Sequence, residues 1–174
     1  MGKALILTFL IITRVSEAGD WRGLAPLSST RADVERLLGR PEQGAGNVYQ
    51  TVGEKVSVTY SEHPCDYGWQ VPLGTVVSFF VYPKNPTPFA GLKLDERKYE
   101  KRKDPHIASR YYYVNPQEGI NYTVDADAGV VLSIERYPSA KDKTRQCSSA
   151  PTVKPEESKS TKAPRKRPRR GRKP

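Results

Sequence analysis

The chain has 174 residues, with 29 Lys and Arg against 19 Asp and Glu, and its formal net charge is +10. That length is enough for one domain of ordinary size. The chain has only two Cys and two His, and a zinc site needs about four good ligands, so we expect no metal site.

The first 18 residues, MGKALILTFLIITRVSEA, predict a secretory signal peptide. Lys3 gives a positive start, and an apolar run follows from Ala4 to Ile12 with only Thr8 interrupting it. Ser16 and Ala18 place small residues where a signal peptidase reads. The alternative is a membrane anchor, but a bilayer core needs roughly 20 apolar residues. We therefore expect cleavage after Ala18 and a secreted or periplasmic protein that is not transmembrane.

Residues 149–174, called the tail below, have a composition from which no core can be built. They contain no aromatic residue and one Val, with much Pro, Lys and Arg, so we expect them to be disordered. Their ten Lys and Arg against two Glu give a net charge of +8, and the signal segment carries +1. Of the total of +10, only about +1 remains for residues 19–148. The high pI therefore belongs to the tail, and no basic groove is expected on the domain.

The run RKRPRRGRKP near the end of the tail is the candidate interaction site. Seven of its ten residues are cationic and none is acidic, which favours docking on a polyanion: nucleic acid, acidic lipid head groups or an acidic glycan. Such binding falls steeply with salt and carries little sequence specificity. A solubilising tail without a dedicated partner is the alternative. The candidate polyanion-binding residues are Arg165, Lys166, Arg167, Arg169, Arg170, Arg172 and Lys173.

The two cysteines, Cys65 and Cys147, predict one disulfide bond, because an even count in an exported chain favours pairing. The bond would close a loop of about 80 residues and stabilise the fold by roughly 4–5 kcal/mol through the entropy of the unfolded chain. A reactive thiol or a metal pair is the alternative, and His63 lies two residues before Cys65.

The stretch SSTRADVERLLGRPE, from Ser28 to Glu42, predicts a short helix. Thr30 caps it with Asp33 in the capping-box position. An apolar stripe follows at Val34, Leu37 and Leu38, and Gly39 and Pro41 end the helix. About nine residues are too few to be stable in isolation, so the helix must pack on something. It is a packing helix and not a recognition helix, since no second helix follows at a short turn and the domain is nearly neutral.

Five strands follow the helix in the sequence. The segment EKVSVTY alternates Val56, Val58 and Tyr60 inward with polar residues outward, which is typical of a half-buried antiparallel strand. The other four are predicted at Gly74–Pro83, Arg110–Val114, Ile120–Asp125 and Val130–Tyr137, with the turns NPQEG and DADAG between the last three. The pattern predicts an α+β fold in which one short helix packs on an antiparallel sheet of about five strands.

The polar segment Lys84–Ser109 is a long connection with an irregular pattern, and a helical turn is predicted around Asp95–Lys103. A connection of this length is either functional or loosely ordered.

All ten Tyr lie between Tyr49 and Tyr137, which marks the part of the chain that can form a core. We therefore assign residues 1–18 to the signal peptide, 19–148 to a single domain and 149–174 to the tail.

The helix and the first strand resemble the SmpA/OmlA/BamE-like domains of exported bacterial proteins. Those domains have a helix of the form x-x-x-V-x-x-L-L-G-x-P that runs into a small antiparallel sheet. The resemblance covers about residues 24–60, and its motif residues here are Val34, Leu37, Leu38, Gly39, Pro41, Val56, Val58 and Tyr60. It implies a bacterial envelope protein that binds other proteins and catalyses nothing.

No catalytic residue is assigned. A general base is most often His, and we interpret His63 and His106 as exposed loop residues. DADAG has two acids two residues apart but lacks the length and the closing Glu of a calcium loop, so we predict a hairpin turn there.

Tyr111 and Tyr113 share one face of a predicted strand, and Tyr112 lies on the other. They form either an aromatic platform for a ligand or, as we favour, part of a sheet covered on both faces.

The sequence therefore favours an exported, non-catalytic binding or structural domain of the bacterial envelope, without cofactor. Its partner is a protein of the envelope, or an anionic polymer or surface reached through the tail. The first alternative is a secreted polyanion or nucleic-acid binder that acts through the tail. The second is an enzyme with an unrecognised site.

Overall fold

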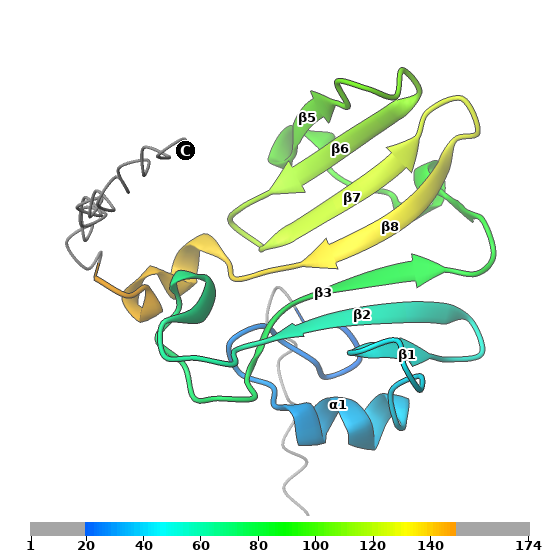
Figure 1. Ribbon diagram of the computed structural model, residues 1–174. Helices are drawn as coiled ribbons and strands as arrows, with labels where there is room; N and C mark the ends of the chain where they lie inside the picture. Colours follow the sequence, from blue (N-terminus) through cyan, green and yellow to red (C-terminus); the bar gives the residue numbers. More distant parts are fainter. Residues whose placement is uncertain (1–19, 149–174) are drawn as a thin grey trace, which may run out of the picture.

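The computed structural model describes residues 20–148, which form one open antiparallel sheet with a single short α-helix at its side (Figure 1). The predicted signal peptide and the tail lie outside the described residues. The strand order is β1-β2-β3-β8-β7-β6-β5, and β4 pairs with β8. The elements are α1 Arg31–Leu38, β1 Val48–Gln50, β2 Glu54–Tyr60, β3 Val76–Pro83, β4 Thr87–Pro88, β5 Glu100–Lys103, β6 Arg110–Asn115, β7 Ile120–Asp125 and β8 Val130–Arg136, with 3-10 turns η1 Asp66–Gly68, η2 Phe89–Leu92, η3 Glu96–Lys98 and η4 Ala140–Arg145.

The predicted α+β fold with about five strands is wrong, because the described chain is mainly β, with eight strands in one sheet that does not close. The five predicted strands correspond to β2, β3, β6, β7 and β8. The three additional strands have only two to four residues each, which is too short for apolar alternation to mark them. All four residues of β5 are charged, so its place in the sheet comes from backbone pairing with β6.

Helix α1 forms as its caps predict. The Thr30 side chain accepts a hydrogen bond from the Asp33 amide, and the Asp33 carboxylate accepts one from the Thr30 amide. Val34 is fully buried, and the half-buried Leu38 packs beside it on the core. Leu37, predicted to belong to the same stripe, is 46% exposed. The helix therefore packs along a narrower line than the stripe predicted.

One row of paired residues crosses six neighbouring strands of the sheet and defines its inner face. It runs from Tyr49 on β1 through β2, β3, β8 and β7 to Tyr113 on β6. Directly opposed residues of antiparallel strands point to the same side, so both core clusters lie on this face. Ile134 on β8 packs against both clusters and joins them.

The N-terminal half of the inner face is covered by α1 and the segment that precedes it. Leu24 and Val34 meet the apolar residues of β1, β2 and β3 there. The hydroxyl groups of Tyr49 and Tyr60 lie 2.8 Å apart inside this cluster, which satisfies two buried polar atoms. Burial beside Tyr49 raises the pKa of the Tyr60 phenol well above its usual value.

The connection Lys84–Ser109 covers the other half of the inner face. It pairs with β8 as β4, passes through η2 and η3, and reaches the far edge of the sheet as β5 (Figure 1). Phe89 packs on Tyr113 with ring centroids 4.4 Å apart, and Tyr99 lies 5.9 Å from Tyr122. The predicted helical turn near Asp95 is η3 followed by β5. The connection is therefore part of the core.

Candidate functional site

The predicted disulfide between Cys65 and Cys147 is present, with the two Cα atoms 5.9 Å apart. It joins the loop after β2 to the segment after η4 and closes a separation of 82 residues. Two backbone hydrogen bonds reinforce the junction, from the Gln70 amide to the Arg145 carbonyl (2.8 Å) and from the Cys147 amide to the Gly68 carbonyl (3.0 Å). The described chain therefore ends at a fixed place on the domain.

The seven cationic residues of the predicted polyanion site, 165–173, lie outside the described residues, so the structure does not place them. It does show where the chain leads into them. Cys147 is next to the last described residue and is bonded to the loop between β2 and β3, at the same end of the sheet as η1 and η4 (Figure 1). The last described residue, Ser148, therefore follows directly after the bonded Cys147.

We call residues 62–74, between β2 and β3, the disulfide loop. It carries two of the most exposed large hydrophobic side chains of residues 20–148, Tyr67 and Leu73, each 64% exposed. Trp69 in the same loop is half-buried, and its backbone pairs with that of Gln146. The sequence analysis missed this surface, because isolated apolar residues in a loop do not show which of them face solvent.

Two non-glycine residues of the disulfide loop have an uncommon backbone conformation. Cys65 and Tyr67 have φ values of 61° and 53°, in the left-handed region that residues other than glycine seldom adopt. The Asp66 carboxylate accepts hydrogen bonds from the Glu62 amide (2.8 Å) and the His63 amide (3.2 Å), which ties the start of the loop. The disulfide and these bonds hold the loop with Tyr67 facing outward.

Two histidines that could act as a base lie on separate exposed loops, His63 after β2 and His106 between β5 and β6. Neither side chain has a carboxylate or nucleophile among its hydrogen-bond partners within residues 20–148. Over the same residues, no group of three His, Cys, Asp or Glu is placed to hold a metal ion. Within residues 20–148, neither histidine therefore belongs to a base–nucleophile pair or to a metal cluster.

The three consecutive tyrosines are structural. Tyr113 is buried under Phe89, and Tyr111 packs on the same inner cluster. The Tyr112 hydroxyl donates to the Asp104 carboxylate at 2.6 Å on the other side of the strand. Asp104 also accepts the His106 and Ile107 amides, and these bonds lower the pKa of its carboxyl. This network fixes the β5–β6 turn.

DADAG forms the hairpin turn between β7 and β8. The Asp125 carboxylate accepts hydrogen bonds from the amides of Asp127 and Ala128. A carboxylate used in this way closes its own turn. The prediction of a turn is confirmed.

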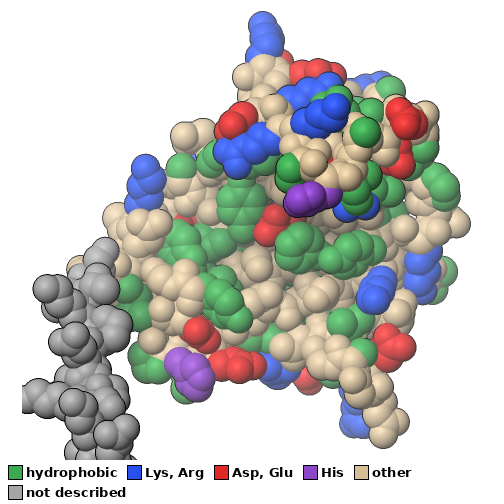
Figure 2. Space-filling model, turned by 45° about the horizontal axis from the view of Figure 1, so that its top comes forward, with side chains coloured by type: hydrophobic (Ala, Val, Ile, Leu, Met, Phe, Trp, Pro, Cys, Tyr) green, Lys and Arg blue, Asp and Glu red, His purple; other side chains and the backbone are tan. Residues whose placement is uncertain are grey.

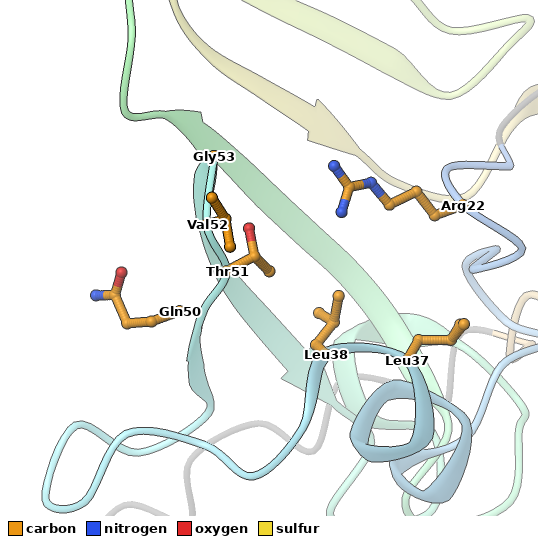
Figure 3. Close-up of a pocket in the computed structure, with 7 residues that line it drawn as sticks. All are labelled: Arg22, Leu37, Leu38, Gln50, Thr51, Val52 and Gly53. Carbon is orange, nitrogen blue, oxygen red and sulfur yellow. The ribbon is translucent and has the colours of Figure 1, made fainter.

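A shallow groove lies between the end of α1 and the β1–β2 turn, with a volume of about 600 Å³ (Figure 3). Leu37 and Leu38 line one side, and Arg22 reaches it from the N-terminal segment. The Arg22 guanidinium is already paired with Glu54 at 2.7 Å. The remaining lining residues are Gln50, Thr51, Val52 and Gly53, none of which supplies a base or a strong nucleophile.

Arg136 lies on the inner face near Tyr99 and Tyr122. Its Nε atom is buried without a hydrogen-bond partner, and no carboxylate of residues 20–148 forms an ion pair with it. Burial lowers the pKa of Arg136, and the nearby phenols of Tyr122 and Tyr99 oppose that effect. Burial raises the pKa of Tyr99 to about 12. Arg136 is therefore a half-buried guanidinium beside two phenols, and no carboxylate within residues 20–148 forms an ion pair with it.

The charge of the described surface is mixed. Lys and Arg lie among Asp and Glu on the face seen in Figure 2, and hydrophobic side chains form separate patches between them. Arg97 and Arg102 each pair with a carboxylate of their own segment, Asp95 and Glu100. This distribution agrees with the near-neutral charge of residues 19–148.

Comparison of the chain with protein-family models, with curated proteins and with solved structures found no match. Within residues 20–148, no helix combines the length and the apolar character that crossing a membrane requires.

Proposed function

We propose that this chain is an exported, non-catalytic binding protein of the bacterial cell envelope whose basic tail attaches it to anionic surfaces. The carrying observation is the division of charge: +8 in the tail against about +1 in residues 19–148. A domain with so little net charge has little electrostatic attraction to a polyanion, whereas the positively charged tail is attracted to one.

The disulfide bond and the predicted signal peptide support the proposed location of the protein outside the cytoplasm. A bond between the only two cysteines is what a chain folding in an oxidising compartment would carry. The segment MGKALILTFLIITRVSEA has the features of a signal peptide. The resemblance to SmpA/OmlA/BamE-like domains favours a bacterial envelope and a protein partner for the domain.

The test is retention of the chain from Gly19 to Pro174 on immobilised heparin over a salt gradient. One variant replaces the seven cationic residues of 165–173 with Gln. A matched control replaces four exposed lysines of the domain, Lys93, Lys98, Lys101 and Lys103, with Gln. We expect only the tail variant to lose retention, because its charges supply the counterion release. Loss in the domain variant alone would contradict the proposal and indicate a basic face on the sheet.

A further inference from the structure

We infer that the face of the sheet opposite the inner face, called the outer face below, binds an arginine side chain of a partner protein at Glu135. The observation that carries the inference is a carboxylate without an ion-pair partner among three aromatic side chains, Phe80, Tyr82 and Tyr137. The inference goes beyond the proposed function, because it concerns the domain and does not depend on the tail.

Strand pairing and spacing place these side chains on one surface. Phe80 on β3 is directly opposite Glu135 on β8, and Glu135 is directly opposite Asn121 on β7. Opposed residues point to the same side of a sheet, and so do residues two apart along an extended chain. Tyr82 follows Phe80 at that spacing, with ring centroids 6.1 Å apart, and Tyr137 follows Glu135. We call these five residues the outer cluster.

The segments that cover the sheet lie on its other side. Helix α1 and the connection Lys84–Ser109 supply residues to the two core clusters of the inner face, and no member of the outer cluster belongs to either. In the view of Figure 1 the connection passes behind β8 and β7. Tyr82 is 38% exposed, and the other four residues are half-buried. A partner can therefore reach this surface.

The Glu135 carboxylate can accept further hydrogen bonds. Its Oε2 atom accepts one, from Asn121 Nδ2 at 3.1 Å. Within residues 20–148 no Lys or Arg forms an ion pair with it. Arg102 on β5 is held by Glu100 through two hydrogen bonds of 2.8 and 2.6 Å, and Lys55 on β2 is exposed. The carboxylate therefore offers an acceptor to a cation from outside the domain.

The phenol rings of the outer cluster lie within reach of the Glu135 charge. Burial raises the pKa of Tyr82 and of Tyr137, and the charge of Glu135 raises both further. Aromatic rings attract cations through their faces, more strongly where water is excluded. A cation that docks at Glu135 would therefore gain both an ion pair and aromatic contacts.

The chemistry of the outer cluster favours a guanidinium. The negative charge of Glu135 repels the polyanions that the tail would attract. A quaternary ammonium has no N–H group to donate to the carboxylate, and a lysine ammonium is a compact point charge that does not stack on a ring. A guanidinium is planar, stacks on aromatic rings and presents a fork of donors that matches a carboxylate. Arginine is also enriched where proteins bind one another.

The experiment titrates the chain from Gly19 to Pro174, with its disulfide intact, with N-acetyl-arginine methylamide and follows the amide signals by nuclear magnetic resonance. N-acetyl-citrulline methylamide is the matched probe, since it has a similar shape and no charge. One test variant is Glu135→Gln, which keeps an acceptor for Asn121, and the other is Tyr82→Thr, which removes a ring. The control is Glu96→Gln, an exposed acid in η3 without an ion pair within residues 20–148. Circular dichroism and the unfolding midpoint check that each variant is folded.

We expect shifts concentrated in β3 and β8, and binding of the arginine probe at least about fivefold tighter than that of the citrulline probe. Both test variants should lose this preference, and Glu96→Gln should keep it. Equal binding of the two probes, shifts confined to other parts of the domain, or unchanged binding by folded Glu135→Gln would overturn the inference.

The same titration of the tail variant, with Gln at the seven cationic positions of 165–173, tests whether the chain's own arginines fill the site. We expect the tail variant to bind the arginine probe as the parent chain does. Binding by the tail variant alone would assign the site to the tail and overturn the inference of a separate partner. Heparin retention tests the proposed function through the tail, so the failure of either proposal leaves the other standing.

Discussion

Gly119 shows how a single backbone position holds the end of the sheet together. It lies in the turn between β6 and β7 with a φ of +61°, and a Cβ atom there would come within 2.1 Å of the Tyr137 carbonyl oxygen and 3.1 Å of the Ser139 nitrogen. The Tyr137 amide donates to the Gly119 carbonyl at 2.9 Å. The turn and the chain after β8 can approach this closely only because the residue has no side chain.

Gly119→Ala should therefore destabilise the domain by about 2–4 kcal/mol, from the left-handed backbone and from the clash together. The matched control is Gly129→Ala. Gly129 has a similar φ of +65° but no atom within 4 Å of the added Cβ, so it should lose only about 1 kcal/mol. Urea unfolding with the disulfide intact measures both. Equal losses would contradict the close approach.

At the level of elements, the connection Lys84–Ser109 is the segment for which the structure differs most from the expectation based on sequence. Its polar, irregular sequence indicated either function or loose order, yet it supplies Phe89, Leu92, Leu94 and Tyr99 to the second core cluster. The Phe89 amide donates to the Gly129 carbonyl at 2.9 Å, which fixes the segment beside β8. A few apolar residues spaced along a polar segment are enough to cover one half of a sheet face.

We expect Phe89→Ala to lower the free energy of unfolding by about 2–3 kcal/mol. This is less than the roughly 3–5 kcal/mol typical of a fully buried Phe, because Phe89 is half-buried. Ile107→Ala is the control in the same connection. Ile107 is 39% exposed and belongs to neither core cluster, so the change should stay within about 0.5 kcal/mol. Guanidinium unfolding measures both, and a Phe89→Ala chain as stable as the parent would mean that the connection is loosely held.

At the scale of the whole molecule, the disulfide links the middle of the chain to its C-terminal part. Cys65 follows β2 in the first half of the sheet, and Cys147 follows η4, after the last strand. The bond therefore encloses β3 to β8 in one covalent loop. It also holds the last described segment, which follows η4, against the disulfide loop.

Replacing both cysteines by Ala should lower the free energy of unfolding by about 4–5 kcal/mol, the chain-entropy value for closing a loop of this length. Thermal unfolding of the double variant, compared with the parent chain before and after reduction, measures the loss. The reduced parent should match the variant. Two free thiols found by mass spectrometry in the exported protein would contradict the presence of the bond in its native setting.

Several features could be predicted from the sequence because their causes are local. The caps at Thr30 and Gly39 mark the ends of α1, and the alternation of Val56, Val58 and Tyr60 marks β2. A chain with two cysteines allows one pairing, and the charge of the tail is a matter of counting. Each of these depends on neighbouring residues or on composition, so no tertiary contact is needed to infer it.

Other features were decided only by tertiary structure. β5 consists of four charged residues, and β4 of Thr87 and Pro88, so neither shows a strand pattern; each is a strand because a partner's backbone lies beside it. Leu37 is exposed and Phe89 is packed because distant segments of the chain leave the first uncovered and contact the second. The local sequence pattern does not show which distant segments will be neighbours. The same holds for Tyr67 and Leu73, which are each 64% exposed although the loop's sequence does not show which of its apolar residues face solvent. Strand pairing and burial depend on contacts between distant segments, and these contacts form only when the chain folds.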